Sequence, residues 1–251
     1  MKALIWDVDG TMAETEEVHR EAYNHAFRAF GLGWRWSLAE YMGLLRVAGG
    51  RERILSYIEA RRPALPGGAP HDVLAARLHE AKNERYTAML RDNRLSARPG
   101  VIRLMRQARA EGVRQAVCTS SSRGNVLPLL DAIAPGGSGL FDCLICGEDA
   151  AAKKPDPHAY RLALDCLGLA PGECLALEDS DSGVRAAVAA GIPVVAVPGL
   201  YSPRDGFDGA LAVLNSLGDP DAPASAVRSP EPLGPGVVDV PALRRWLKAE
   251  G

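Results

Sequence analysis

The stretch Ile5-Trp6-Asp7-Val8-Asp9-Gly10-Thr11 decides the fold, because it joins an apolar run to a pair of carboxylates. The run from Ala3 to Trp6 predicts a short buried strand that stops at turn-forming residues. Carboxylates after such a strand lie at the carboxyl edge of an open α/β sheet, where ligands bind. Their charge requires a cation or hydrogen-bond donors nearby. A solvated Asp-x-Asp-Gly turn is the alternative interpretation.

Length and charge narrow the class of protein. The 251 residues suit one large domain or a domain with an insertion, and the net charge is −2. This small charge gives no basic field for nucleic acid or acidic membranes. No apolar run approaches the roughly 20 residues of a membrane span. Because the N-terminus enters a strand without a leader, we expect a cytoplasmic protein, or an organellar one if a transit peptide is missing. We also expect a monomer.

The cysteines are expected to pack in the protein interior and not to bind metal or take part in redox reactions. There are five: Cys118, Cys143, Cys146, Cys166 and Cys174. Four lie in apolar surroundings, where cysteine usually acts as a small buried hydrophobe. The pair Cys143-x-x-Cys146 has no second Cys or His pair at zinc spacing, which disfavours a metal or redox role. A reducing cytoplasm fits this usage best.

Short apolar runs alternate with helical patterns along most of the chain. The predicted strands are 2–6, 114–118, 143–146, 174–177 and 193–197. Helices are predicted over 101–111, 158–167 and 184–190, and each is followed by a glycine. This alternation predicts a parallel sheet covered on both faces.

The alternation is interrupted after the first strand. Helical patterns alone occupy the insertion, over 16–30, 38–45, 51–60 and 73–91, with a Pro/Gly-rich stretch from Pro63 to Pro70. We therefore predict a core domain of residues 1–14 and 97–217 and a helical cap of residues 15–96. Residues 218–251 are predicted as a Pro-rich loop and a short helix, 241–248.

Four polar sites follow predicted strands. They are Asp7-x-Asp9-Gly10-Thr11, Thr119-Ser120-Ser121-Ser122, Lys154-Pro155 and Glu178-Asp179-Ser180. In a parallel sheet all four converge on one edge.

Together these sites supply the parts of a phosphoryl-transfer reaction. One carboxylate can attack phosphorus, and a second can transfer protons. Hydroxyls and backbone N–H groups can hold phosphate oxygens, while a lysine neutralises developing charge. The remaining carboxylates suit Mg²⁺, which prefers oxygen ligands.

The four sites resemble the motifs of the haloacid dehalogenase-like hydrolase superfamily, in its subgroup with a C1 cap. The resemblance implies an α/β fold with a Rossmann-like parallel sheet core and an all-helical cap after the first strand. It implies Asp7 as nucleophile and Asp9 as general acid and base. Mg²⁺ would be held by Asp7, the Asp9 carbonyl, Asp179 and, directly or through water, Glu178. By the same resemblance, Thr119 and the Ser120 backbone bind the phosphoryl group that Lys154 balances.

Further stretches are similar to phosphatases associated with Calvin-cycle operons, which remove xylulose 1,5-bisphosphate, an inhibitor of Rubisco. They include residues 13–19, 49–54, 79–82 and 198–201. Thr11 favours water as acceptor, because related β-phosphoglucomutases tend to carry an apolar residue there. Two departures are Arg51, where a lysine is expected, and the chain after Phe207.

The cap offers residues that could bind a phosphorylated sugar. The candidates are Glu16, His19, Tyr41, Gly49, Gly50, Arg51, Arg53, His79 and Lys82. Glycines before a helix can bring N–H groups to an anion, and arginine binds phosphate through two parallel hydrogen bonds. These residues predict that the cap holds a second, non-reacting phosphate of the substrate. The predicted substrate is therefore a sugar bisphosphate. A phosphosugar mutase and a non-catalytic phosphosugar-binding regulator remain the alternatives, while haloacid dehalogenation is disfavoured.

Overall fold

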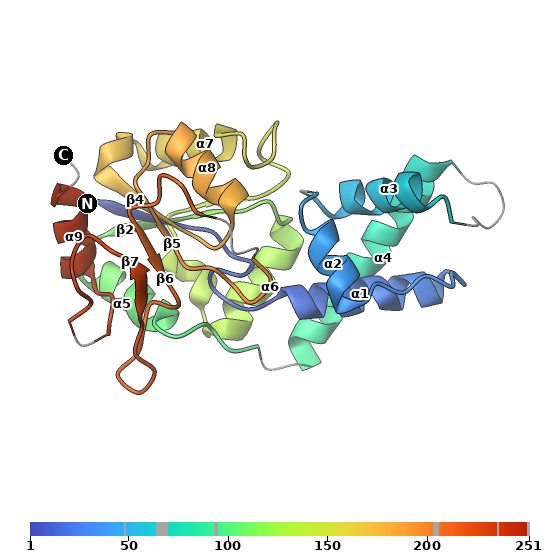
Figure 1. Ribbon diagram of the computed structural model, residues 1–251, viewed down its shortest axis with the longest axis horizontal. Helices are drawn as coiled ribbons and strands as arrows, with labels where there is room; N and C mark the ends of the chain where they lie inside the picture. The colour runs from blue at the N-terminus through green and yellow to red at the C-terminus, as the bar shows by residue number, and fades with distance from the viewer. Residues whose placement is uncertain (48, 64–69, 93–94, 203–205, 235, 250–251) are drawn as a thin grey trace. The chain divides into compact units, whose positions relative to one another are not determined.

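The computed structural model describes residues 1–251 except 48, 64–69, 93–94, 203–205, 235 and 250–251 (Figure 1). Most of the Pro/Gly-rich stretch from Pro63 to Pro70 therefore lies outside the described residues. The chain divides into two compact units. The core unit comprises Met1–Glu14 and Leu95–Gly251, and the helical unit comprises Thr15–Arg94.

The core unit is built on a seven-stranded sheet. Its strands are β1 (Ala3–Trp6), β2 (Arg114–Cys118), β3 (Cys143–Ile145), β4 (Cys174–Glu178), β5 (Val194–Ala196), β6 (Ala212–Leu214) and β7 (Ala226–Arg228). The order is β3-β2-β1-β4-β5-β6-β7. Strands β1 to β6 are parallel, which confirms the predicted sheet. Because β1 pairs with both β2 and β4, its carboxyl end lies where the strand order reverses, a usual ligand position.

The C-terminal part of the sheet departs from the prediction. Strand β6 was not predicted, and β7 pairs with it in antiparallel orientation within a segment expected to be only loop and helix. All three residues of β7 are exposed, so the strand shows no alternation of apolar and polar side chains. The predicted terminal helix is present as α9 (Val240–Ala249).

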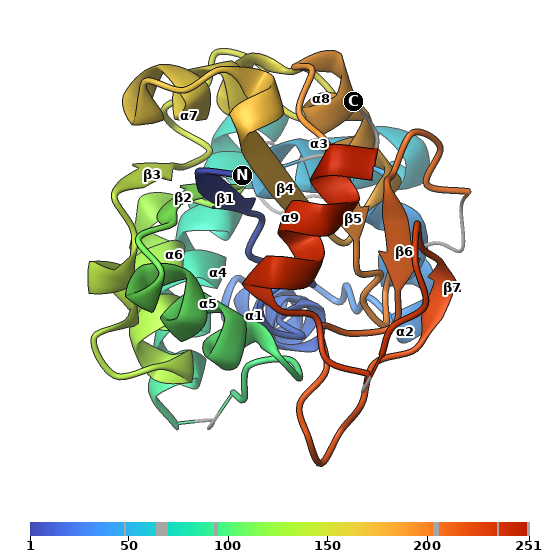
Figure 2. The same ribbon diagram turned by 90° about the vertical axis from the view of Figure 1, so that its left-hand side faces the viewer.

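Helices cover both faces of the sheet. They are α5 (Val101–Ala110), α6 (Arg123–Ile133), α7 (His158–Leu167) and α8 (Asp181–Ala189), with short 3-10 turns at Gly137–Leu140 and Pro171–Glu173. Figure 2 shows α7 and α8 on one side of the sheet and α5 and α6 on the other. Ala3 and Ile5 pack toward α7 and α8, while the Nε1 of Trp6 donates to Gln115 Oε1 at 3.1 Å on the opposite face. Burial on both faces explains why β1 is apolar at every position.

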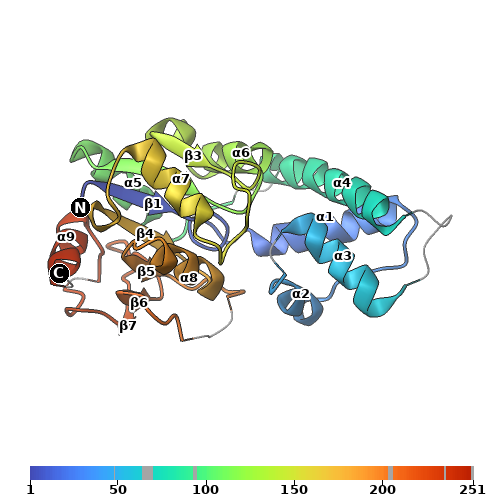
Figure 3. The same ribbon diagram turned by 90° about the horizontal axis from the view of Figure 1, so that it is seen from above.

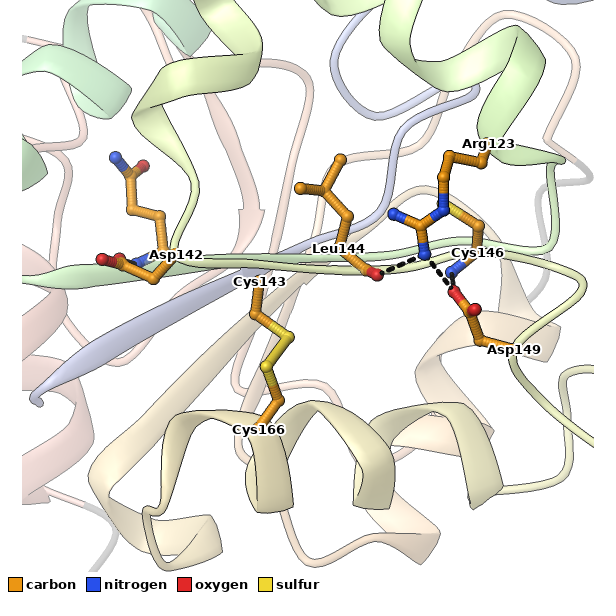
Figure 4. The surroundings of a disulfide bond; sticks show 8 residues. Arg123, Asp142, Cys143, Leu144, Cys146, Asp149 and Cys166 are labelled. Carbon is orange, nitrogen blue, oxygen red and sulfur yellow. Dashed lines mark hydrogen bonds and ion pairs between the residues drawn. A yellow bond between two sulfur atoms is a disulfide. The ribbon is translucent and has the colours of Figure 1, made fainter.

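A disulfide joins β3 to α7, between Cys143 and Cys166 (Figure 4). The expectation that these two act as separate buried hydrophobes was therefore wrong. They lie 23 residues apart in sequence, and their pairing follows from α7 packing on β3. The other three cysteines, Cys118, Cys146 and Cys174, are free and buried, as expected.

The helical unit contains α1 (Glu16–Ala29), α2 (Leu38–Leu44), α3 (Gly50–Arg61) and α4 (His71–Asp92), which confirms an all-helical insertion after β1. Helices α1 and α4 lie side by side, with α3 against α4 (Figure 3). Its core is aromatic, and Tyr23, Phe27 and Trp36 are almost fully buried. No helix within the described residues of either unit is long and apolar enough to cross a bilayer.

Candidate active site

Asp7 and Asp9 leave the carboxyl end of β1 in a tight turn. Asp7 is 7% exposed, so the interpretation as a solvated turn is wrong for this residue. Thr11 Oγ1 donates to Asp7 Oδ2 at 3.1 Å. Gly10 has a φ of 84°, and a Cβ there would collide with the Asp179 carboxylate. The turn therefore depends on glycine both for its backbone conformation and for the close approach of a second carboxylate.

Lys154 connects three of the four predicted sites. Its Nζ donates to Asp7 Oδ1 at 2.8 Å and to Glu178 Oε1 at 2.5 Å. A third hydrogen bond, at 2.8 Å, goes to the carbonyl of Cys118 at the end of β2. Lys154 is 6% exposed and Glu178 is fully buried. The lysine thus links the ends of β1, β2 and β4, as the convergence of parallel strands predicts.

The Glu178 carboxylate is held from two further directions. The Tyr160 hydroxyl, in the first turn of α7, donates to Glu178 Oε1 at 2.7 Å. On the side of α8, the backbone of Gly183 lies so close that a Cβ would collide with the carboxylate. Sequence reasoning missed Tyr160 and Gly183, because a tyrosine and a glycine in amphipathic helices carry no signal of this contact.

The hydroxyl-rich site after β2 meets the first site directly. Thr119 is buried, and its Oγ1 accepts from the backbone N–H of Ser121 at 3.1 Å. The Ser121 hydroxyl donates to Asp9 Oδ2. Ser120 is half-buried between them in sequence, two residues before the N-cap of α6. Ser121 was predicted only as part of a polar run, and the structure gives it a contact with Asp9.

Burial and charge act in opposite directions at this site. Burial raises the pKa of Asp7 to about 7, while Lys154 lowers it and Glu178 raises it. Burial alone would lower the pKa of Lys154, but the two neighbouring carboxylates hold it well above its usual value. The lysine therefore stays charged. Asp7 still lies in an environment with excess negative charge, which a further cation would offset.

The donor set fits a hard divalent cation. Asp7, Glu178 and Asp179 each offer a carboxylate oxygen, and these atoms lie within 4.8 Å of one another. Asp179 Oδ2 also accepts from Ser202 Oγ at 2.6 Å, which orients the carboxylate. Oxygen ligands with excess negative charge suit Mg²⁺. The expected role of the Asp9 carbonyl as a further ligand stays a prediction.

Arg98 holds the turn after β1 through hydrogen bonds, and sequence reasoning missed this residue. Its guanidinium donates to the carbonyls of Gly10 and Val197 and, at 2.8 Å, to that of Pro198. Its Nε lies 3.3 Å from Glu14 Oε1. This buried arginine ties the loop after β1 to the loop after β5, and no motif in the sequence marks it.

The helical unit gathers some of the predicted substrate-binding residues. Gly50, His79, Lys82 and His19 lie close together around the rings of Tyr23 and Tyr86. We call these six residues the cap cluster. A Cβ at Gly50 would collide with His79 Nε2 and with the Tyr23 hydroxyl.

The rings of the cap cluster hold its cation. Lys82 Nζ lies 5.2 Å from the ring centroid of Tyr23 and 4.9 Å from that of Tyr86. His19 stacks on Tyr86 with centroids 4.0 Å apart. Both tyrosines were missed, although each lies four residues after a predicted candidate on the same helix face.

Other predicted cap residues bind one another. The Tyr41 hydroxyl donates to Glu16 Oε2 at 2.7 Å. Arg53 donates to the Tyr41 hydroxyl at 3.2 Å and to the carbonyl of Leu44 at 3.1 Å. These contacts shape the segment between α2 and α3. Arg51 is exposed in the first turn of α3, and Gly49 is the N-cap of that helix.

The fold and this set of side chains define a class of enzyme. The model of the haloacid dehalogenase-like hydrolases matches residues 1–191, three-quarters of the chain. The chain therefore belongs to the haloacid dehalogenase-like hydrolase family. Within the family it is a phosphatase. The pairing of Asp7 with Lys154 at the sheet edge agrees with this activity.

The particular relatives are proteins called CbbY. The chain is 44% identical to CbbY of Rhodobacter capsulatus, with 84% of this chain and 91% of that protein covered. It is 40% identical to the plasmid-encoded CbbY of Cupriavidus necator over 98% of this chain and 96% of that one. A crystal structure of CbbY from Rhodobacter sphaeroides in complex with xylulose 1,5-bisphosphate matches with a TM-score of 0.81 and 40% identity. This match covers 86% of this chain and 94% of that one.

Proposed function

We propose that the protein is a Mg²⁺-dependent sugar-bisphosphate phosphatase that hydrolyses xylulose 1,5-bisphosphate to xylulose 5-phosphate and phosphate. The observation that carries the reaction type is the buried contact of Lys154 with both Asp7 and Glu178. Similarity to a CbbY crystallised with xylulose 1,5-bisphosphate supports the substrate.

The first half of the reaction forms an aspartyl phosphate. An oxygen of Asp7 attacks phosphorus and the ester P–O bond breaks. Asp9 donates a proton to the leaving sugar oxygen, and the hydroxyl of Ser121 orients its carboxylate for this step. Thr119 and the backbone N–H of Ser120 bind phosphoryl oxygens, and Lys154 offsets the charge that develops on them.

The second half regenerates the carboxylate. Asp9, now ionised, removes a proton from water, and the water oxygen attacks phosphorus. The bond between phosphorus and Asp7 breaks, and inorganic phosphate is released. Thr11 donates to Asp7 Oδ2 and steadies the same carboxylate through both steps.

A divalent cation held by Asp7, Asp179 and the Asp9 carbonyl, with Glu178 nearby or through water, would supply charge stabilisation for the phosphoryl group. The residues of the helical unit would bind the second phosphate. Lys82 carries the charge for this role and the N-terminus of α3 at Gly50 carries N–H groups. The chemistry of the cap cluster and the bisphosphate in the related crystal structure support this assignment.

Phosphate release with and without Mg²⁺ tests the proposal. Xylulose 1,5-bisphosphate is compared with ribulose 1,5-bisphosphate, xylulose 5-phosphate and phosphoglycolate. We expect kcat/KM for xylulose 1,5-bisphosphate to exceed that for either monophosphate by at least about tenfold, since one charge-assisted phosphate contact is worth that much. EDTA should abolish turnover.

Three results would contradict the assignment. Equal or faster turnover of the monophosphates would exclude a bisphosphatase. Isomerised sugar phosphate with little free phosphate would indicate a phosphosugar mutase. Tight sugar-phosphate binding in calorimetry without Mg²⁺-dependent turnover would indicate a binding regulator.

A further inference from the structure

The helical unit contains a cavity that the proposed reaction does not use. Its volume is about 170 Å³. Residues from α1, from α4 and from the segment after α1 line it: Arg20, Glu21, Asn24, His25, Arg28, Arg35, Arg85 and Met89. We call it the arginine cavity.

The arginine cavity lies on a different side of α1 from the cap cluster. At 3.6 residues per turn, His25 and Arg28 are rotated by at least about 120° around α1 from His19 and Tyr23. No residue of the cap cluster lines the cavity. The cavity is therefore a separate feature of the helical unit.

Its floor is rigid. Asn24 is buried, and its side chain holds both polar groups of the Trp36 backbone, accepting from N–H at 2.7 Å and donating to the carbonyl at 3.0 Å. Arg20 donates to the same carbonyl at 2.9 Å. Because Trp34 and Trp36 are buried on one side of this extended segment, Arg35 between them faces outward at the rim.

Positive charge at the cavity is only partly balanced. Four arginines line it against one glutamate. Arg20 pairs with Glu17, whereas Arg28, Arg35 and Arg85 form no ion pair within the described part of the chain. The Nε of Arg85 is buried and has no hydrogen-bond partner among the described residues.

The pKa of the histidine at the rim responds both to burial and to this charge. Burial, followed by the charges of Arg85 and Arg28, lowers the pKa of His25. An isolated cationic histidine on a solvated helix face would not be disfavoured in this way. Converging guanidinium groups with unused donors are the usual means by which proteins bind phosphate oxygens.

We propose that the arginine cavity binds a phosphate-bearing anion, as a second anion site outside the reaction site. Arg85 supplies the buried donor, Arg28 and Arg35 close over the ligand from the rim, and Asn24 keeps the floor in place. Bound phosphate would relieve the repulsion among the arginines.

The resonances of His25 test the site locally. Inorganic phosphate and, separately, glycerol 3-phosphate are titrated into the full chain at constant ionic strength maintained with chloride. The histidine ring signals are followed by NMR and assigned with His25→Gln. We expect a saturable shift of the His25 signal and an increase in its pKa of roughly 0.5–1 unit. A larger response to one anion distinguishes free phosphate from a phosphate monoester as the ligand.

Variants separate binding from screening. Arg85→Gln and Arg35→Gln should each weaken the response at least about fivefold, because each removes charge-assisted hydrogen bonds. Arg77→Gln removes the same charge from α4 outside the cavity and should leave the response unchanged. A shift that chloride reproduces, or one that survives in Arg85→Gln and Arg35→Gln, would overturn the proposal. Because turnover is not measured, failure here is distinguishable from failure of the phosphatase assignment.

Discussion

The sheet edge of the core unit and the cap cluster of the helical unit place a lysine in different ways. Lys154 has three hydrogen-bond acceptors, two of them carboxylates, and they come from the ends of three strands. Lys82 lies over two tyrosine rings and donates to Asn83 Oδ1 at 3.3 Å. The first arrangement is neutralised and rigid, as chemistry requires. The second places the ammonium group near two aromatic rings, whose faces attract cations.

This contrast assigns separate tasks to the two units. Strand ends in a parallel sheet bring reacting groups together whatever the substrate. Helix faces in an insertion can change their side chains without disturbing those groups. We therefore expect substitutions in the core unit to abolish turnover of every phosphate ester, and substitutions in the cap cluster to act on some substrates more than others.

The largest effect is expected from Asp7→Asn. The amide cannot form the aspartyl phosphate, so turnover of all substrates should fall by about 10⁴-fold or more. Phosphate release measures this directly. Asp165→Asn, on the exposed side of α7, is the matched control and should keep its activity. Substantial turnover by Asp7→Asn would remove Asp7 as the nucleophile.

The charge at the sheet edge predicts a pH dependence of stability. In metal-free protein burial raises the pKa of Asp7 to about 7, above the usual aspartate value of 3.8. The folded protein thus keeps a proton that the unfolded chain loses, and the stabilisation present at low pH is lost as pH rises toward 7. Between pH 4 and 7 the free energy of unfolding of the wild type should fall by up to roughly 4 kcal/mol more than that of Asp7→Asn.

Urea unfolding in EDTA checks this difference, and saturating Mg²⁺ should reduce it because a cation stabilises the ionised carboxylate. Parallel pH curves for the wild type and Asp7→Asn would show that Asp7 is ionised throughout and that the excess negative charge is already balanced.

A smaller loss is expected from Gly183→Ala in α8. The added Cβ would collide with the Glu178 carboxylate and displace it from Lys154. We expect kcat to fall by about 10²-fold for all substrates, because the lysine loses its position. Gly124→Ala is the matched control, because it adds the same methyl group in the first turn of α6, where the space around it is open. This variant should keep its activity. Equal activity of the two variants would show that the Gly183 contact has no part in placing Glu178.

The two units also differ in how far sequence predicts them. Asp7 and Glu178 are predictable because they lie at the ends of buried apolar strands, and Lys154 because it lies in the polar loop that follows β3. Tyr160 and Arg98 are not predictable, since their partners are a carboxylate and carbonyl groups distant in sequence. The same holds for the disulfide of Cys143, whose partner lies on a helix.

In the helical unit the four helices are predictable from periodicity, but the partners of their polar residues are not. Arg53 illustrates this, because the residue pattern suggested phosphate binding and the structure directs its donors to Tyr41 and backbone carbonyls. His79 and Lys82 share a predicted face, yet the rings beside Lys82 come from both α1 and α4. Packing between helices decides which partners each cationic side chain has, and the sequence pattern does not specify that packing.

The division of tasks is tested most directly by Lys82→Met, which keeps the side-chain stem over the rings and removes the charge. The measurement is the ratio of kcat/KM for xylulose 1,5-bisphosphate to kcat/KM for p-nitrophenyl phosphate, in this variant and in the wild type. We predict that the ratio falls at least about tenfold, because one charge-assisted phosphate contact is lost. An equal loss on both substrates, with the ratio unchanged, would contradict the account.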